Sequence, residues 1–285
     1  MENFTQNVLS RLNCKDQRTK FILTKLISHL HDFIHDVKPT EKEFFKAIDF
    51  LTRTGQTCND KRQEFILLSD VLGASMFIDA INHAINNNAT DSTVKGPFHA
   101  KAKMMNHGDN IANGPEAETG EQTVIYGQVT DENGIPIENA LADIWQSNDT
   151  GFYDVQDEHQ PEMNLRGIFT TDVKGKFWFK TIKPAPYPVP TDGPVGEILR
   201  AMGRHPMRPA HIHFMITAEG YETLITHLFV KGDPYLDSDA VFGVKDSLIV
   251  DFIPDHSKEK ATALDFKIPF YVITYNFRLK QKNSL

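Results

Sequence analysis

The sequence predicts an α+β protein, with a helical N-terminal domain over residues 1–100 followed by an antiparallel β-sandwich domain over residues 101–285. Two observations support this fold class. Apolar residues recur every three or four positions in the first hundred residues, which is the period of a helix. After the stretch NHGDNIANGPEAETG, short runs rich in Val, Ile, Phe, Tyr and Thr alternate with turn residues, as in strands. A chain of 285 residues with 40% hydrophobic content can bury a core in each part.

Three amphipathic helices are expected in the N-terminal part. Between 17 and 37 the apolar residues form one stripe at helical spacing. A second helix should begin after Thr40, because Thr40 and Glu43 form a capping box, and should end near Gly55. A third is predicted over 60–85, where it stops at a run of three asparagines.

Seven runs in the second part have the composition of strands and no predicted helix between them, which is typical of a β-sandwich. The segments DENG and DVKG between such runs are turns with glycine placed for positive φ. The predicted strands are 123–130, 140–148, 166–172, 175–182, 210–217, 223–230 and 246–252.

Composition excludes several classes of partner and location. The net charge of -8, with no blocks of basic residues, argues against binding to nucleic acid or to an anionic membrane surface. No apolar run approaches the roughly 20 residues that span a bilayer, and the start has no signal-peptide core, so a cytoplasmic protein is expected. The two cysteines, Cys14 and Cys58, are expected to be free thiols. A metal would therefore need oxygen and nitrogen ligands.

The segment RPAHIHF, 208–214, places two histidines on a predicted buried strand. Side chains two apart on a strand share a face, so His211 and His213 project into one space, which suggests a metal site. Alternatively, the pair lies at a strand edge and binds water. A rival pair, His31 and His35, shares one helix face, but this face lies opposite the apolar stripe and is expected to be solvated.

Two tyrosines occupy unusual positions. Tyr153 follows a strand in the turn-rich segment WQSNDTGFYD, and Tyr187 lies between prolines in PAPYPVPTDGP. Flanking prolines fix φ and hold Tyr187 in place. Both tyrosines could instead cap the core of the sandwich, which is a common role for this residue.

The combination of GFYD, PYPVPTDGPVGEIL and RPAHIHF, with VKGPFH upstream, resembles the intradiol ring-cleaving dioxygenases over nearly the whole chain. These are non-haem iron(III) enzymes that open catechols between the two hydroxyl-bearing carbons. The resemblance implies one Fe(III) per subunit, bound by Tyr153, Tyr187, His211 and His213. The residue types fit, because two anionic phenolates beside two imidazoles favour trivalent iron over zinc.

The resemblance also implies two catalytic residues. Tyr187 is expected to leave the iron when substrate binds and to accept a proton from it. Arg208 is expected beside the substrate ring, where it stabilises negative charge that develops on carbon. Strict alternation would not place Arg208 with the two histidines, but Pro209 breaks the strand and lets Arg208 turn inward. The alternative is a surface arginine.

The segment 220–248 is similar to the hydroxyquinol-cleaving members of the family, with His227 where catechol enzymes commonly carry glutamine. The expected substrate is benzene-1,2,4-triol, and the product is 3-hydroxy-cis,cis-muconate, the enol of maleylacetate. Asp70 is the candidate partner of the third hydroxyl, and Lys95 is less expected in an apolar wall. The predicted substrate-binding residues are Leu67, Asp70, Val94, Gly96, Pro97, Phe98, Val189, Pro190, His227 and Val241.

Two alternative functions stay open at this stage. One is a catechol or chlorocatechol 1,2-dioxygenase, which relative rates on the free diols would distinguish. The other is a non-catalytic β-sandwich binding module with an inert His-x-His, which would lack the visible colour of iron(III)–phenolate coordination. By resemblance, the N-terminal helices are expected to form a homodimer interface, with a phospholipid bound there.

Overall fold

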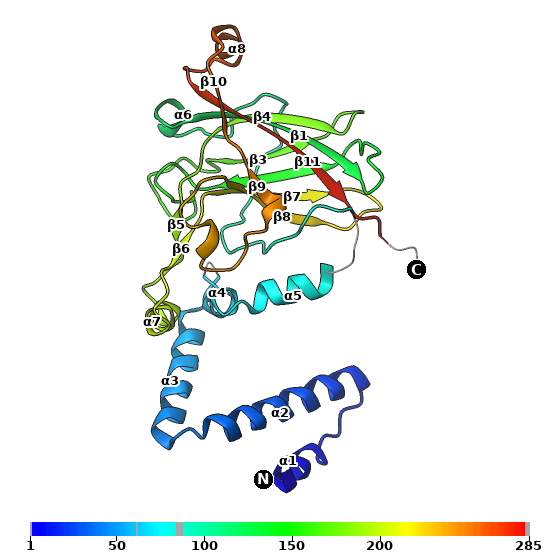
Figure 1. The fold of residues 1–285 in the computed structure, drawn as a ribbon, viewed down its shortest axis with the longest axis vertical. Coiled ribbons are helices and arrows are strands. Elements are labelled where there is room, and N and C mark those ends of the chain that lie inside the picture. Colours follow the sequence, from blue (N-terminus) through cyan, green and yellow to red (C-terminus); the bar gives the residue numbers. More distant parts are fainter. Residues whose placement is uncertain (1, 61, 84–87, 283–285) are drawn as a thin grey trace. The chain divides into compact units, whose positions relative to one another are not determined.

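The computed structural model describes residues 2–60, 62–83 and 88–282. Its contacts divide the chain into two compact units, one up to Gln56 and one from Thr57 onward. The first unit contains the helices α1, Glu2–Leu9, and α2, Gln17–Val37, and nearly all of α3, Glu41–Thr57 (Figure 1). The expected boundary at residue 100, between a helical domain for dimerisation and a sandwich domain for iron binding, stays a prediction.

Helix α2 has the predicted bounds, and α3 begins as predicted. The Thr40 amide donates to the Glu43 carboxylate at 2.8 Å, and the Glu43 amide donates to Thr40 Oγ1 at 3.3 Å, which is the expected capping box. The predicted end at Gly55 is wrong, because α3 continues to Thr57. A glycine within a helix weakens it without ending it.

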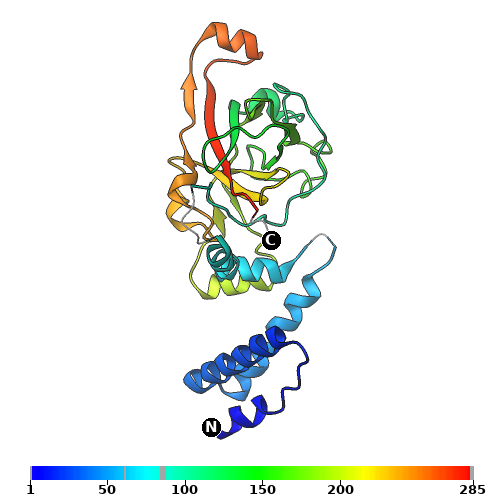
Figure 2. The same cartoon turned by 90° about the vertical axis from the view of Figure 1, so that its right-hand side faces the viewer.

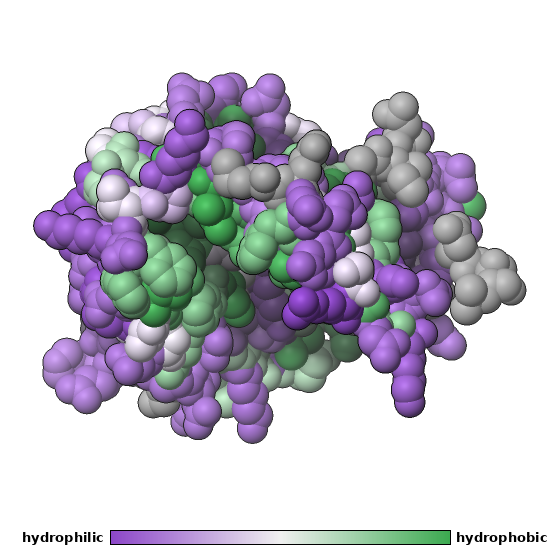
Figure 3. Space-filling model, turned by 90° about the horizontal axis from the view of Figure 1, so that it is seen from below, coloured by the Kyte–Doolittle hydropathy of each residue, from purple (hydrophilic) through white to green (hydrophobic). Residues whose placement is uncertain are grey.

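The apolar stripe of the first unit is uncovered in a single chain. Within α2, which is described in full, no side chain is buried. Leu26 and Phe33 of α2 and Phe45 of α3 are 58%, 59% and 65% exposed. In the space-filling view of Figure 3, exposed hydrophobic residues appear as green patches among purple hydrophilic ones. An exposed face of this size on amphipathic helices indicates an interaction surface.

The predicted third helix is two helices in the structure, α4, Glu64–Val71, and α5, Ala74–His83. Gly73 separates them with φ +75°, a conformation that ends a helix, so the prediction of one continuous helix was wrong. Its predicted end falls on residues 84–87, which lie outside the described residues. The buried Glu64 carboxylate accepts the amide of Val195, so α4 is joined to α7, Pro194–Ala201. The two helices lie side by side (Figure 2).

The rest of the second unit is a sandwich of two sheets, with strand orders β10-β11-β1-β4 and β3-β2-β7-β8-β9 (Figure 1). The short strands β5 and β6 form a separate ribbon. The strands are β1 Gln122–Asp131, β2 Leu141–Gln146, β3 Arg166–Thr170, β4 Lys176–Ile182, β5 Tyr187–Pro188, β6 Met207–Arg208, β7 His211–Thr217, β8 Leu224–Val230, β9 Ile249–Val250, β10 Ile253–Asp255 and β11 Phe270–Leu279. The short helices α6, Glu116–Thr119, and α8, Lys258–Leu264, flank these strands in sequence.

The predicted strands correspond to β1, β2, β3, β4, β7, β8 and a shortened β9. The glycines of the DENG and DVKG turns have φ +84° and +68°, as expected. The sheets are mixed and not purely antiparallel, because β1 pairs with β11, and β8 with β9, in parallel. The first pair involves the C-terminal strand, which was not among the predicted strands, and the second joins two strands that were predicted.

The main core lies between the two sheets, and it determines where the histidines point. Ile212 and Phe214 of β7 are fully buried in this core with Phe179 and Phe277. Because side chains alternate along a strand, His211 and His213 occupy the opposite face of the same sheet. In the part of the chain that the structure describes, no helix is both long and apolar enough to cross a membrane.

Candidate metal centre and active site

Four donor atoms form a closed ring on the outer face of the β2–β7–β8 sheet. Tyr153 Oη lies 3.0 Å from His213 Nε2 and 3.3 Å from Tyr187 Oη. His211 Nε2 lies 3.2 Å from His213 Nε2 and 3.4 Å from Tyr187 Oη. Donors at about 2.0 to 2.1 Å from one ion in tetrahedral directions are about 3.3 Å apart. The spacing of these four donors therefore matches that of ligands to a single metal ion.

The sheet positions the two histidines. His213 is paired with Trp145 of β2, and the two rings stack with centroids 4.6 Å apart and planes 13° from parallel. His211 Nδ1 donates a hydrogen bond to the carbonyl of Pro209 at 2.7 Å. A carbonyl only accepts, so the proton is on Nδ1 and the Nε2 lone pair faces the ring of donors.

Two loops position the tyrosines. The side-chain oxygen of Asn148, just after β2, accepts hydrogen bonds from the backbone amides of Thr150 and Phe152. These bonds fold the loop that carries Tyr153. Gly151 has φ +89°, and a Cβ at this position would lie 2.9 Å from Tyr187 Cβ. The two tyrosine loops can therefore approach each other only because residue 151 has no side chain.

Burial determines the charge that the donors themselves carry. It lowers the pKa of His211 to about 3 and that of His213 well below its usual value, so both imidazoles are neutral with free lone pairs. Burial raises the pKa of Tyr153 well above 10, because a phenolate is poorly solvated there. A strong cation would reverse this preference for the neutral phenol. Two neutral imidazoles and two phenols that ionise beside a cation fit a trivalent metal.

Arg208 lies within this site and is itself held by a buried carboxylate. Tyr187 of β5 pairs with Arg208 of β6, so the two side chains start from neighbouring positions. Arg208 is 4% exposed, and its Nη1 lies 3.3 Å from His211 Nε2. Its Nε and Nη2 donate to the two oxygens of Asp239 at 3.0 and 3.3 Å. Burial alone would lower the pKa of Arg208, but Asp239 and the tyrosine oxygens outweigh it and raise the pKa.

His227 lies behind His213 as seen from the ring of donors. Its Nε2 is 2.7 Å from His213 Nδ1, and the residue is fully buried. His211, His213 and His227 form the cluster of potential metal ligands of the His, Cys, Asp and Glu types that the described residues contain. In the rival pair, His31 Nδ1 lies 3.0 Å from Thr5 Oγ1, and His35 Nδ1 lies 3.4 Å from Asp36 Oδ1.

Some of the predicted substrate-binding residues contact the ring of donors, and others form a buried cluster of their own. Leu67, Val189 and Val241 pack in one buried apolar cluster. The Phe98 ring stacks on Tyr153 with centroids 4.7 Å apart, and the Cβ position of Gly96 lies 3.5 Å from His213 Cε1. Of the remaining predicted residues, Pro97 is exposed, and Val94 and Pro190 are half-buried.

Asp70 is the polar exception in this wall. Its side chain is buried at the end of α4, and burial raises its pKa, while the charge of Arg208 lowers it and that of Asp239 raises it. The carboxyl group therefore lies within electrostatic reach of the site. Lys95, which was unexpected in an apolar wall, is exposed.

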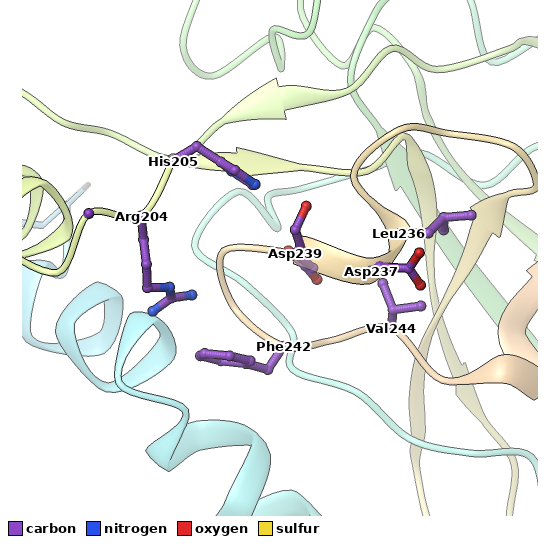
Figure 4. A pocket seen from close by; sticks show the side chains of 9 residues that line it. Arg204, His205, Leu236, Asp237, Asp239, Phe242 and Val244 are labelled. Carbon is purple, nitrogen blue, oxygen red and sulfur yellow. The ribbon is translucent and has the colours of Figure 1, made fainter.

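A cavity of about 430 Å³ lies beside the Arg208–Asp239 pair. Asp239 and His205 form part of the lining of this cavity (Figure 4). Arg204 and Phe242 also line it, and the Arg204 guanidinium lies 4.4 Å from the centroid of the Phe242 ring. Arg204 also donates to the carbonyl of Ala240 at 2.9 Å. These contacts hold the 239–243 loop, which carries Val241, against the site.

Two family profiles match this chain and together cover most of it. Residues 94–281 match the family described as Dioxygenase, and residues 16–90 match the one described as Catechol dioxygenase N terminus. The chain belongs to the intradiol ring-cleavage dioxygenase family. Enzymes of this family depend on non-haem iron(III), and the donor ring of this intradiol dioxygenase fits such an ion.

Individual relatives are similar over nearly the full length. The hydroxyquinol 1,2-dioxygenase of Rhizobium sp. strain MTP-10005 is 49% identical, over 93% of this chain and 90% of its own. The 6-chlorohydroxyquinol 1,2-dioxygenase of Cupriavidus pinatubonensis is 52% identical, over 88% of this chain and 91% of that relative's own length. The solved structure of a hydroxyquinol 1,2-dioxygenase from Pseudomonas putida DLL-E4 superposes with a TM-score of 0.89 at 45% identity, over 99% and 100% of the two chains.

Sequence reasoning missed two residues of this intradiol site. Trp145 stacks on His213, but only the pairing of β2 with β7 reveals this contact. Asp239 pairs with Arg208 from a loop 31 residues away. The segment DSDAVFG contains two carboxylates, and nothing local distinguishes the buried one.

Proposed function

We propose that the chain is a hydroxyquinol 1,2-dioxygenase, which opens the ring of benzene-1,2,4-triol with O2 to give 3-hydroxy-cis,cis-muconate, the enol of maleylacetate. The ring of four donors at 3.0 to 3.4 Å carries the intradiol part of this proposal. The similarity to hydroxyquinol enzymes supports the substrate. A catechol or chlorocatechol 1,2-dioxygenase is the alternative within the family.

One Fe(III) per subunit would be bound by Tyr153, Tyr187, His211 and His213. When bound, ferric iron supplies the Lewis acidity that keeps both tyrosines as phenolates and withdraws electron density from the substrate oxygens. The neutral imidazoles contribute lone pairs without adding charge. The surrounding apolar side chains, such as Phe98 against Tyr153, exclude water from the reacting atoms.

Two residues of the chain would act on the substrate itself. The Tyr187 oxygen would accept a proton from one of the two adjacent hydroxyls, which leaves that hydroxyl as an oxyanion. Arg208 keeps its charge at all working pH values and is held in place by Asp239. Its guanidinium would stabilise negative charge that develops on the ring, and it requires no rearrangement to do so.

The third hydroxyl needs a polar partner in an otherwise apolar wall. A buried hydroxyl without a hydrogen bond costs about 1 to 3 kcal/mol. Asp70 is buried, and Arg208 and Asp239 act on its charge, which supports its placement at the substrate pocket. We assign Asp70 the recognition of this hydroxyl. Leu67, Val189 and Val241 would contact the ring from the same buried cluster.

The enzyme is proposed to be a homodimer in which the exposed faces of α2 and α3 pack against a second copy. These faces carry large apolar side chains that a single chain leaves uncovered. A cavity of about 890 Å³, lined by α1, α2 and the residues after α2, lies in this unit. It is the proposed place for a phospholipid acyl chain, which organic extraction of the pure protein and mass spectrometry would detect.

Initial rates of O2 uptake on benzene-1,2,4-triol and on catechol test the function. The iron-loaded protein is assayed on both, and a Tyr187→Phe variant corrects for autoxidation of the triol. Faster uptake with the triol is the expected result. Faster uptake with catechol would retain the ring-cleaving chemistry and overturn the substrate. No uptake from a protein that has bound iron would overturn the enzyme itself.

A further inference from the structure

Four side chains form one row across the sheet. In register, Arg166 of β3 lies opposite Trp145 of β2, Trp145 lies opposite His213 of β7, and His213 lies opposite His227 of β8. Residues directly opposite each other on neighbouring strands share a face and touch. His213 is therefore held between a stacked indole and a second imidazole, whose centroid is 4.1 Å away.

The two ring nitrogens of His213 have different partners. Nε2 belongs to the ring of donors, with Tyr153 Oη at 3.0 Å, and Nδ1 lies 2.7 Å from His227 Nε2. A metal needs the lone pair of Nε2, so the proton of neutral His213 must be on Nδ1. His227 Nε2 then accepts this hydrogen bond. His211 has the same arrangement, with the carbonyl of Pro209 as its acceptor.

The other ring nitrogen of His227 carries its proton in this arrangement. If its Nε2 accepts, its own proton is on Nδ1. A neutral imidazole carries one proton only, so His227 cannot also donate from Nε2. His227 Nδ1 is a buried atom that has no hydrogen-bond partner among the described residues. The contact with His213 is therefore the only hydrogen bond that the described residues give the His227 ring, and the unpaired N–H at Nδ1 carries the cost of a buried group without a partner.

We propose that His227 is a positioning residue that fixes the tautomer and ring orientation of His213, and that it does not contact the substrate. This inference rests on the proposed function, because it assumes that His213 binds the iron. Nδ1 and Nε2 diverge from the imidazole ring, so a group that contacts Nδ1 is turned away from the donors at Nε2. For the same reason His227 is not a further ligand, although it belongs to the histidine cluster.

Two substitutions separate the hydrogen bond from mere packing. His227→Gln keeps an acceptor at this position, whereas His227→Leu fills similar space without one. Thr226→Val is the matched control, because Thr226 is equally buried on the same strand and donates one hydrogen bond, to the Asp91 carbonyl at 2.7 Å. It lies on the other face of β8, and its loss measures the effect of removing one buried hydrogen bond from this strand.

The iron-loaded enzymes are compared by two measurements that do not depend on turnover: the iron(III)–phenolate absorption band, and the transfer of iron to an excess of a ferric chelator. His227→Leu is expected to weaken iron binding about 10- to 100-fold and to shift the band. His227→Gln and Thr226→Val should stay close to the wild type. If His227→Leu does not fold, His227→Met replaces it in the same comparison.

Wild-type-like iron retention and an unshifted band in the leucine variant would overturn the inference, as would a glutamine variant that behaves like the leucine one. Both results leave the proposed iron centre intact, because the wild type still has its band. A wild-type protein that binds no ferric iron would overturn the proposed function, and this inference with it. The two failures are therefore distinguishable.

Discussion

Replacing Arg208 by methionine tests the buried charge pair of the site. The side chains of Arg208 and Asp239 are 4% and 2% exposed, and they form two hydrogen bonds at 3.0 and 3.3 Å. Removing one partner of such a pair leaves the other charge buried, which typically costs 3 to 5 kcal/mol, at the higher end where the pair is well enclosed. For a cooperative unit of about 230 residues, each kcal/mol lowers the Tm by about 2 to 4 °C, so a fall of about 6 to 20 °C is expected.

The double variant Arg208→Met/Asp239→Asn separates stability from catalysis. Asparagine removes the unpaired charge, and its one carbonyl oxygen can still accept from the amide of Val241 or of Gly243, which bond to different oxygens of the carboxylate at 3.2 and 3.0 Å. At least half of the lost Tm should return. Turnover should not, because the loss of a preorganised charge near the reacting atoms lowers kcat about 10²- to 10³-fold in both variants.

Thermal unfolding followed by circular dichroism, together with O2 uptake on the triol, gives both quantities. Iron content is measured in parallel, so that a loss of turnover is not confused with a loss of metal. Recovery of kcat in the double variant would refute the catalytic role of Arg208. An unchanged Tm in the single variant would refute the reasoning about the buried charge.

Four further predictions follow from particular contacts. Gly151→Ala should lower both Tm and iron content, because its Cβ would lie 2.9 Å from Tyr187 Cβ. The control is Gly134→Ala, which has a similar φ of +84° and no atom within 4 Å of the added Cβ, and which should lower Tm only slightly. Equal losses in the two variants would contradict the prediction. The metal-free protein should lose stability as the pH falls below about 6.5. Burial lowers the pKa of His211 to about 3, so between these values only the unfolded chain takes up the proton, and urea unfolding at pH 7.5 and pH 5 should reveal the difference. Asp70→Leu should reduce the preference for triol over catechol, measured as the ratio of kcat/KM, by about 5- to 150-fold, as expected for 1 to 3 kcal/mol; an unchanged ratio would remove Asp70 from recognition. Phe33→Glu, at a 59% exposed position of α2, should convert the proposed dimer to a monomer in sedimentation velocity, whereas a wild-type monomer would exclude the interface.

Local signals predicted local structure well. The bounds of α2 and the cap of α3 follow from side chains within a few residues of each other, and sequence analysis found both. The break at Gly73 was missed because EFILLSDVLGASMF has an unbroken apolar character, whereas the backbone needs positive φ there. β11 was missed although FYVITYNFRL is rich in strand-forming residues, and its parallel pairing with β1 depends on a partner more than 130 residues away.

The candidate site shows the same division between local and long-range information. The positions of Tyr153, Tyr187, His211 and His213 in one ring agree with what the motifs imply, since each motif is short and contiguous. Several partners of these four residues lie elsewhere in the sequence and belong to no such motif. Trp145, His227 and Asp239 reach the site through strand register or from a distant loop, and no spacing in the sequence encodes these contacts.

The two halves of the donor ring are held by different means, and this predicts how they respond to change. His211 and His213 stand on a strand in the middle of a five-stranded sheet, and each has an Nδ1 partner that fixes its ring. Tyr153 and Tyr187 come from loops that meet at Gly151. Burial also raises the pKa of Tyr153, so its phenol becomes anionic only when a cation is present, whereas His211 and His213 are neutral in either case. Substitutions in the loops should therefore alter the phenolate band before they alter the folding of the sheet, because the sheet does not depend on the tyrosines for its pairing.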